Sequence, residues 1–441
     1  MINIANVSFL KKNNPLKVSL IGLLFWVFIF FLIPLRIKLQ IGLMPFVYLI
    51  TNYIFFFLGL KIISQTKSEK ELTYTTNKRI LWRILYIVIF IASIGLFLKI
   101  LDKFYIREAS FSNSISYNRF LLERSGASVI SIISAITNAF CFLPLFIYYM
   151  IQPKNRILFW LSVLLFFSAG FEFIMLGSRS GLFVIIILFS AYLFYFKKIK
   201  ITPIQFLTGI GILCFLGIFS TQLFIERTKD FAKTDKVAIE HILKRSNYNF
   251  TITPKEETKV KIIKSSNKTL QAARLTTVNF AQYYLHGAFE FGYLYNNYNK
   301  NHYYGAYTFN ILVKFINIIF RTNFDLKEIQ NAPPRTGVYT TFFGPIFIDF
   351  GWFSLIFMFF FGVLQKLIFN RTLEGRFQFI PLLFYMLIIN FFMPVFNFIN
   401  GAQGIYTICS FLIFILLYII LTGKLKISKE NGKTQYVRIL K

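Results

Sequence analysis

The stretch ILFWLSVLLFFSAGFEFIMLGSRSGLFVIIILFSAYLFYF, residues 157–196, consists of two apolar runs on either side of the short polar break Gly177-Ser178-Arg179-Ser180. Each run approaches the length of about 20 apolar residues that crosses about 30 Å of hydrocarbon as a helix. An unpaired cation at a membrane mouth is costly, so Arg179 marks a site where an anion would be bound. The stretch therefore predicts a membrane-crossing helical hairpin with an anion site at its turn.

The rest of the chain repeats this pattern of long apolar runs. Of its 441 residues 56% are hydrophobic and 58 are phenylalanine, and its mean hydropathy is +0.61. These values are typical of an all-α polytopic integral membrane protein. Ten transmembrane helices are predicted, at 16–35, 39–63, 80–100, 129–151, 157–176, 181–196, 203–224, 341–364, 377–394 and 404–421. The first run resembles a signal peptide, but it is too long and has no small-residue cleavage site, so we expect it to stay as an anchor.

The basic residues of the short loops predict the orientation of these spans. Lys and Arg collect in every second short loop and in the basic tail, whereas the other short turns carry few. Because short cytoplasmic loops are enriched in Lys and Arg, both termini are expected in the cytoplasm. Four regions follow: a membrane bundle at 1–224, a large extracytoplasmic loop at 225–340, a second bundle at 341–423 and a cytoplasmic tail at 424–441.

The charge of the chain has two parts. Much of the formal net charge of +30 is the inner collar of a membrane protein, which attracts anionic lipids and is no sign of nucleic-acid binding. The predicted outer loop, however, has 17 basic and 9 acidic residues on a face where orientation requires no positive charge. This excess favours an anionic substrate at the outer surface, or is simply a solvated face.

The sequence offers no metal or cofactor site. Cys141, Cys214 and Cys409 lie inside apolar runs, where cysteine behaves as a small hydrophobic residue. The three histidines, His241, His286 and His302, are too widely spaced for a zinc pattern, and Asp-x-Asp is absent from the sequence. We therefore expect chemistry without a metal, a nucleotide sugar or another cofactor.

Three pieces of the outer loop show order. The alternating charges of 222–245 predict a solvated helix, and the non-periodic stretch 247–268 predicts a mobile excursion. Residues 279–295 predict a helix with one polar stripe, Asn279, Gln282, His286 and Glu290. A His and a Glu four residues apart can hydrogen-bond, which would suit a general base, although a surface pair is the simpler alternative.

Residues 306–321 predict an amphipathic helix that lies flat in the outer interface, as an anchor or as a guide for a lipid-linked substrate.

The loop ends in Pro333-Pro334-Arg335-Thr336-Gly337, and the eighth span follows with Asp349 inside it or at its mouth. A carboxylate there needs a partner, for which Arg179, Arg335 and Arg274 are candidates. Glu172 lies seven residues before Arg179 and competes for it.

Gly177-Ser178-Arg179-Ser180-Gly181-Leu182, the single large loop in the second half, and TTFFGPIFIDFGW at 340–352 together resemble the Wzy-type O-antigen and capsular repeat-unit polymerases. The layout is similar over the whole chain, whereas the motifs cover only these two stretches. Arg179 and Asp349 are the functional residues that the resemblance carries over. There is one departure: large all-helical lipid-linked glycosyltransferases usually hold an acid in the first outer loop, whereas here that loop is Arg36-Ile37-Lys38. A general base would therefore come from later in the chain.

The resemblance implies an enzyme of the bacterial cytoplasmic (inner) membrane that joins oligosaccharide repeat units carried on undecaprenyl pyrophosphate. Membrane lipids, a flippase and a chain-length regulator are its expected partners, with no nucleic acid. We assign pyrophosphate binding to Arg179, Arg335 and Arg274, because guanidinium forks suit that anion. Proton transfer is assigned to His286 or Glu290, and a further catalytic role to Asp349.

Two alternatives remain open from the sequence. An O-antigen ligase would have the same layout and pyrophosphate chemistry but would join the finished chain to a lipid core. A flippase or other transporter would be expected to show two matching halves and charges buried in mid-membrane. The sequence does not indicate the sugar, the linkage, the chain length or a choice between O-antigen and capsule.

Overall fold

The computed structural model describes residues 7–66, 78–113, 115–124, 128–175, 179–196, 207–209, 211, 215, 217–219, 221, 235–265, 267–422, 424–430 and 433–438. This part of the chain is mostly helical, with only short strands. Six of the helices are long and apolar enough to cross a membrane: Pro15–Leu32, Leu43–Ile62, Lys78–Ile106, Val129–Ile151, Phe343–Leu373 and Gly404–Thr422. The prediction of an all-α membrane protein is confirmed at this level.

Three other predicted spans coincide with helices: α8 (Arg156–Met175), α9 (Arg179–Tyr195) and α18 (Ile380–Phe392). The predicted span at 203–224 lies mostly outside the described residues. The total of ten membrane spans therefore stays a prediction.

Two of these six long helices contain a local change in helix geometry. The first is α4 (Lys78–Ile100), which continues into a π-helical turn, η1 (Leu101–Ile106). The second, Phe343–Leu373, is broken at Gly351, whose φ of 53° lies in the left-handed region that favours glycine. Short helix α16 (Phe343–Phe350) precedes this break, and η4 (Gly351–Phe353) and α17 (Ser354–Leu373) follow it. Asp349 thus lies at the end of a separate short helix, ahead of the 20-residue helix α17.

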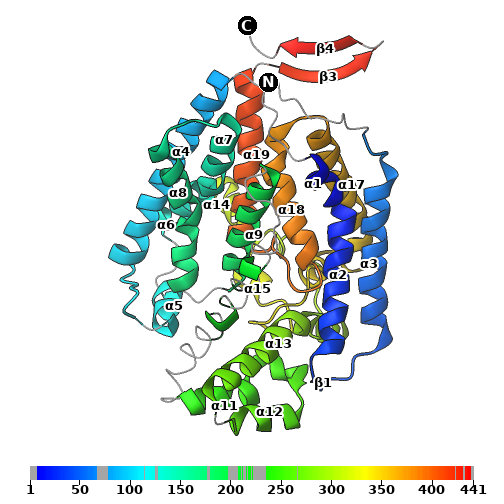
Figure 1. Ribbon diagram of the computed structural model, residues 1–441. Helices are drawn as coiled ribbons and strands as arrows, with labels where there is room; N and C mark the ends of the chain where they lie inside the picture. The colour runs from blue at the N-terminus through cyan, green and yellow to red at the C-terminus, as the bar shows by residue number, and fades with distance from the viewer. Residues whose placement is uncertain are drawn as a thin grey trace.

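The helices form two groups that stand side by side (Figure 1). One group contains α4, α6 (Val129–Asn138), α7 (Leu143–Ile151) and α8, with the 3₁₀ turn η2 (Ala139–Phe142) between α6 and α7. The other contains α1 (Val7–Lys12), α2 (Pro15–Leu32), α3 (Leu43–Ile62), α17 and α18, and α18 begins after the 3₁₀ turn η5 (Phe377–Phe379). Helices α9 and α19 (Ala402–Thr422) lie between the groups. One contiguous apolar core extends through both groups.

Glycines allow the closest of these helix contacts. A Cβ at Gly59 of α3 would run into the carbonyl oxygen of Phe359 in α17, and one at Gly362 of α17 would run into that of Phe56 in α3. In a membrane, small residues let two backbones approach until van der Waals packing holds them. The α3–α17 pair is therefore fixed by reciprocal glycine contacts.

The two ends of the molecule are built from different elements. The termini and the hairpin of β3 (Lys424–Glu430) and β4 (Lys433–Arg438) lie at one end. At the other end lie β1 (Leu35–Ile37), α11 (Asp235–Arg245), α12 (Glu256–Ile263) and the long helix α13 (Lys268–Asn297) (Figure 1). α5 (Ile115–Arg124) lies near this end too, beside α8. The candidate site is built at this end.

The stretch 247–268 differs from the prediction of a mobile excursion. It contains η3 (Asn247–Phe250), β2 (Ile252–Pro254) and α12, and β2 pairs antiparallel with β1, Arg36 facing Thr253. Its order comes from partners distant in sequence, because the side chain of Gln282 donates to Asn249 Oδ1 at 2.6 Å and to the carbonyl of Ile252 at 2.8 Å. The pairing of β1 with β2 joins the first predicted outer loop to the large loop at 225–340.

The large loop continues in two short helices. Helix α14 (Asn310–Phe320) confirms the helix predicted at 306–321, although its place in an interface stays a prediction. Asn317 of α14 fastens the turn that follows, since its Oδ1 accepts from Thr322 at 2.7 Å and from the Phe324 amide at 3.2 Å. Helix α15 (Leu326–Gln330) comes next, and Asp325 caps its start.

Candidate functional site

The polar stripe of α13 points into the protein. Asn279, Gln282, His286 and Glu290 lie on one face of this helix as predicted, and each is at most 3% exposed. Gln282, His286 and Glu290 each contact a residue outside α13. The alternative of a pair on a solvated surface helix is therefore wrong.

The ring of His286 is held at both nitrogens. Nδ1 lies 3.0 Å from the carbonyl oxygen of Gln282 and 2.9 Å from that of Tyr283, while Nε2 lies 3.4 Å from the backbone nitrogen of Tyr339. Carbonyl oxygens only accept, so Nδ1 carries the proton and Nε2 presents its lone pair to the Tyr339 N–H. The ring of Tyr248 packs against the imidazole, with centroids 4.2 Å apart. The partners of His286 thus assign the tautomer in which Nε2 is the basic atom.

Glu290 forms an ion pair with Arg335. Arg335 Nε donates to Glu290 Oε2 at 3.1 Å, and the Thr251 hydroxyl donates to Oε1 at 3.1 Å. The guanidinium also donates to the carbonyl of Asn247 at 3.0 Å and lies 3.9 Å above the ring of Phe250. The side chain of Arg335 is 25% exposed, whereas that of Glu290 is 1% exposed. A buried carboxylate therefore holds an arginine that a ligand can still reach.

Burial governs the ionisation of Glu290. Desolvation raises the pKa of its carboxyl group, and the nearby Arg335 charge and the Thr251 and Arg335 hydrogen bonds reduce that rise. Perturbed carboxyl groups of this kind collect at functional sites, although structural ion pairs also produce them.

The turn 247–251 is the part of this site that sequence reasoning missed. Asn247, Tyr248, Phe250 and Thr251 contact Arg335, His286 or Glu290, yet they lie in the stretch predicted to be mobile. No periodic pattern marks a turn whose role depends on contacts to other elements. Its cluster of Asn and aromatic residues was the available signal.

Asp349 has a different environment from the one predicted. Its Oδ1 accepts from the Tyr307 amide and its Oδ2 from the Thr308 amide, both at 2.8 Å, and its side chain is fully buried. The Tyr304 amide also donates to the backbone carbonyl of Asp349 at 2.9 Å. The backbone amides of Tyr307 and Thr308 thus satisfy this carboxylate in place of the predicted arginine. The structure makes Asp349 the anchor of that segment, and its catalytic role stays a prediction.

The two remaining predicted arginines are not placed in the cluster. The side chain of Arg179 lies outside what the structure describes, although its backbone begins α9. Arg274 is exposed on α13, twelve residues before His286 in sequence. A rise of about 1.5 Å per residue separates their positions by about 18 Å along the helix. Pyrophosphate binding by these two residues stays a prediction, and Arg335 is the cation found beside His286 and Glu290.

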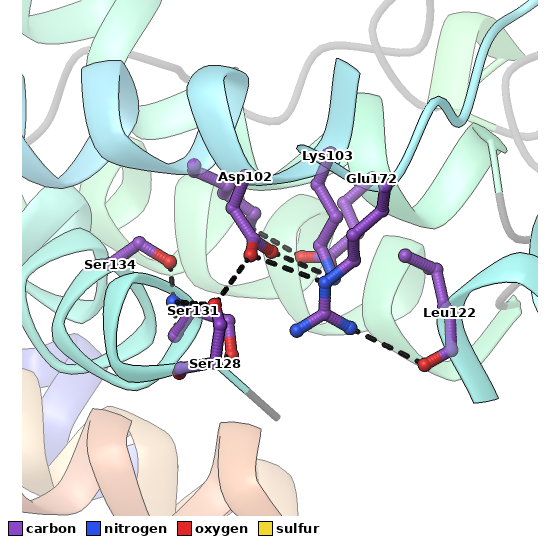
Figure 2. A network of polar contacts seen from close by, with 9 residues as sticks. Asp102, Lys103, Leu122, Ser128, Ser131, Ser134 and Glu172 are labelled. Carbon is purple, nitrogen blue, oxygen red and sulfur yellow. Dashed lines mark hydrogen bonds and ion pairs between the residues drawn. The ribbon is translucent and has the colours of Figure 1, made fainter. Parts of the chain in front are cut away.

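Glu172 forms ion pairs with a lysine of α4 and a lysine of η1. It lies 2.6 Å from Lys99 Nζ and 3.5 Å from Lys103 Nζ. Figure 2 shows this network at the π-helical turn, where buried Asp102 accepts from Arg107 Nε at 3.2 Å and from the Ser128 hydroxyl at 3.0 Å. Sequence reasoning missed it, although Lys99, Lys103 and Arg107 recur every four residues at the end of an apolar run. The network links the ends of α4 and α8 to the start of α6.

Within the described ranges, no three His, Cys, Asp or Glu side chains gather where they could hold a metal ion. Comparison of the chain with protein-family models, curated proteins and solved structures found no match.

Proposed function

We propose that this chain is a metal-independent glycosyltransferase that polymerises oligosaccharide repeat units linked to undecaprenyl pyrophosphate, at the outer face of the bacterial cytoplasmic membrane. The observation that carries the proposal is the cluster of His286, Glu290 and Arg335 at one end of a bundle of apolar helices. It brings a basic nitrogen, a carboxylate and an accessible guanidinium together in a low-dielectric setting. The resemblance in layout and in two motifs to the Wzy-type polymerases supports it.

In the proposed reaction, the hydroxyl oxygen of one lipid-linked unit attacks the anomeric carbon of the chain carried on a second lipid. The new glycosidic C–O bond forms as the C–O bond to pyrophosphate breaks. The hydroxyl proton passes to Nε2 of His286, and the lipid pyrophosphate leaves with the bonding electron pair. A general base within hydrogen-bond reach of the hydroxyl and a cation at the departing oxygens are the two groups that such a displacement needs.

Arg335 binds the pyrophosphate in this proposal, and Glu290 is its partner until then. Arg335 stabilises the charge that develops on the pyrophosphate, and its exposed edge can offer further N–H donors. Before the pyrophosphate binds, Glu290 holds the guanidinium through Nε. Asp349 contributes indirectly, by holding the segment 304–308.

The test is a gel of surface polysaccharide from the native host with this gene deleted. A polymerase defect collapses the ladder to a core that bears one repeat unit, because single units are still exported and attached. Complete loss of attached units would instead point to ligation or flipping and would overturn the proposal.

Point variants expressed in the deletion strain locate the chemistry. His286→Gln is expected to give the one-unit pattern, because the amide cannot accept the proton. His241→Gln is the matched control on α11 and is expected to restore the ladder. A full ladder with His286→Gln at equal protein abundance would exclude His286 as the base.

A further inference from the structure

The segment 331–340 covers the two titratable residues of the site and is called the strap here. His286 is fully buried beneath it and Glu290 is 1% exposed, whereas Tyr339 of the strap is 36% exposed. Gly337 has a φ of 75°, and a Cβ added there would meet open space. The strap thus forms the outer cover of the His286–Glu290 pair.

Polar contacts hold the strap near its start, its middle and its end. Lys300 Nζ donates to the carbonyl of Asn331 at 3.1 Å near its start. Arg335 binds Glu290 and the Asn247 carbonyl near its middle. The Tyr339 amide donates to His286 Nε2 near its end. The first two of these contacts use the cations Lys300 and Arg335, and the last uses the candidate base.

The closed strap and the proposed chemistry compete for the same atoms. Nε2 of His286 cannot take a proton from a substrate hydroxyl while the Tyr339 amide occupies its lone pair. Arg335 cannot turn fully to an anion while its Nε is bound to Glu290. The strap must therefore move from this position before either group can act.

The ion pair is suited to exchange. The side chain of Arg335 is 25% exposed, so a ligand in solution can reach the guanidinium while it is bound to Glu290. A pyrophosphate group carries more charge than one carboxylate and accepts several N–H donors at once. It can thus replace Glu290 as the partner of the guanidinium.

We infer that the strap is a gate opened by its ligand: a pyrophosphate group draws Arg335 away from Glu290, and the strap then uncovers Nε2 of His286. The inference rests on the proposed function in its choice of ligand and deepens it by giving the order of events. The anion binds first, and the base becomes available afterwards. In the absence of that anion the base stays capped, so that other hydroxyl compounds do not reach it.

Hydrogen–deuterium exchange of the full-length protein in lipid nanodiscs tests the gate, with inorganic pyrophosphate as the probe. The peptide that contains 336–340 is expected to exchange about tenfold faster with saturating pyrophosphate. Arg335→Gln should exchange fast with and without the probe, and Lys327→Gln, an exposed charge on α15, should behave as wild type. Glu290→Gln keeps the side-chain shape and should also open the strap without ligand.

The inference is overturned if pyrophosphate binds and the strap exchanges more slowly or unchanged, or if pyrophosphate binds equally well to Arg335→Gln. Failure of pyrophosphate to bind the wild type would overturn it too. These outcomes are separate from the polysaccharide gel. If pyrophosphate does not open the strap but the ladder still collapses to one unit on deletion, the polymerase proposal stands. If pyrophosphate opens the strap but the ladder does not collapse to one unit, the gate stands without that function.

Discussion

At the scale of single residues, Glu290 should make stability depend on pH. Burial raises its pKa in the folded protein, so folding favours the protonated form. The stability that follows is present below the ordinary glutamate pKa of about 4.3 and is lost as the pH rises through the folded-state value. Glu290→Gln mimics the protonated form, so its melting temperature relative to wild type should increase with pH over that window.

Thermal unfolding in detergent between pH 4.5 and pH 7.5 measures this difference. The control is Glu257→Gln, which removes an exposed carboxylate from α12. A constant offset between Glu290→Gln and wild type across the range would show that burial does not control this group.

Asp349 and Asp325 form a matched pair at the same scale. Each carboxylate accepts from two backbone amides, but Asp349 is fully buried and Asp325 is exposed at the start of α15. An unsatisfied buried amide costs about 1–3 kcal/mol, whereas water replaces a lost exposed bond. Asp349→Ala should therefore lower the unfolding temperature well beyond Asp325→Ala.

The two roles of Asp349 can be separated by Asp349→Asn. An anchor keeps part of its function with asparagine, because one amide oxygen still accepts. Loss of all polymer with Asp349→Asn at unchanged stability would instead support the catalytic role.

At the scale of elements, the α3–α17 contact depends on two glycines. Gly59→Leu should separate the helices, because its side chain would occupy the space of the Phe359 carbonyl. Overpacking of this kind typically costs about 1–3 kcal/mol. Gly42→Ala is the control at the start of α3, since a Cβ there meets nothing within 4 Å. Melting temperatures of the purified variants should fall for Gly59→Leu alone.

At the scale of the whole molecule, the termini and the region of α11–α13 occupy opposite ends (Figure 1). The basic-loop pattern predicts that the terminal end is cytoplasmic. In a background without Cys141, Cys214 and Cys409, a membrane-impermeant thiol reagent added to spheroplasts should label Lys261→Cys and not Lys429→Cys. Labelling of Lys429→Cys in sealed spheroplasts would reverse the orientation.

The sequence by itself determined the class of the protein and much of its helical content. Apolar length marks a membrane helix regardless of its neighbours, and the spacing of Asn279, Gln282, His286 and Glu290 places four side chains on one face of α13. Both signals are local, because rise and periodicity are properties of a single helix.

Only the tertiary structure decided which groups meet. Arg335 joins Glu290 across 45 residues, Asp349 binds amides 41 and 42 residues away, and the stretch 247–254 is ordered by α13 and β1. No pattern along the chain encodes these pairings, because a side chain selects its partner by distance and direction in the folded protein. The sequence therefore indicated His286 and Glu290 as a pair on one helix face and Arg335 as one of three candidate arginines, and the tertiary structure placed Arg335 on Glu290.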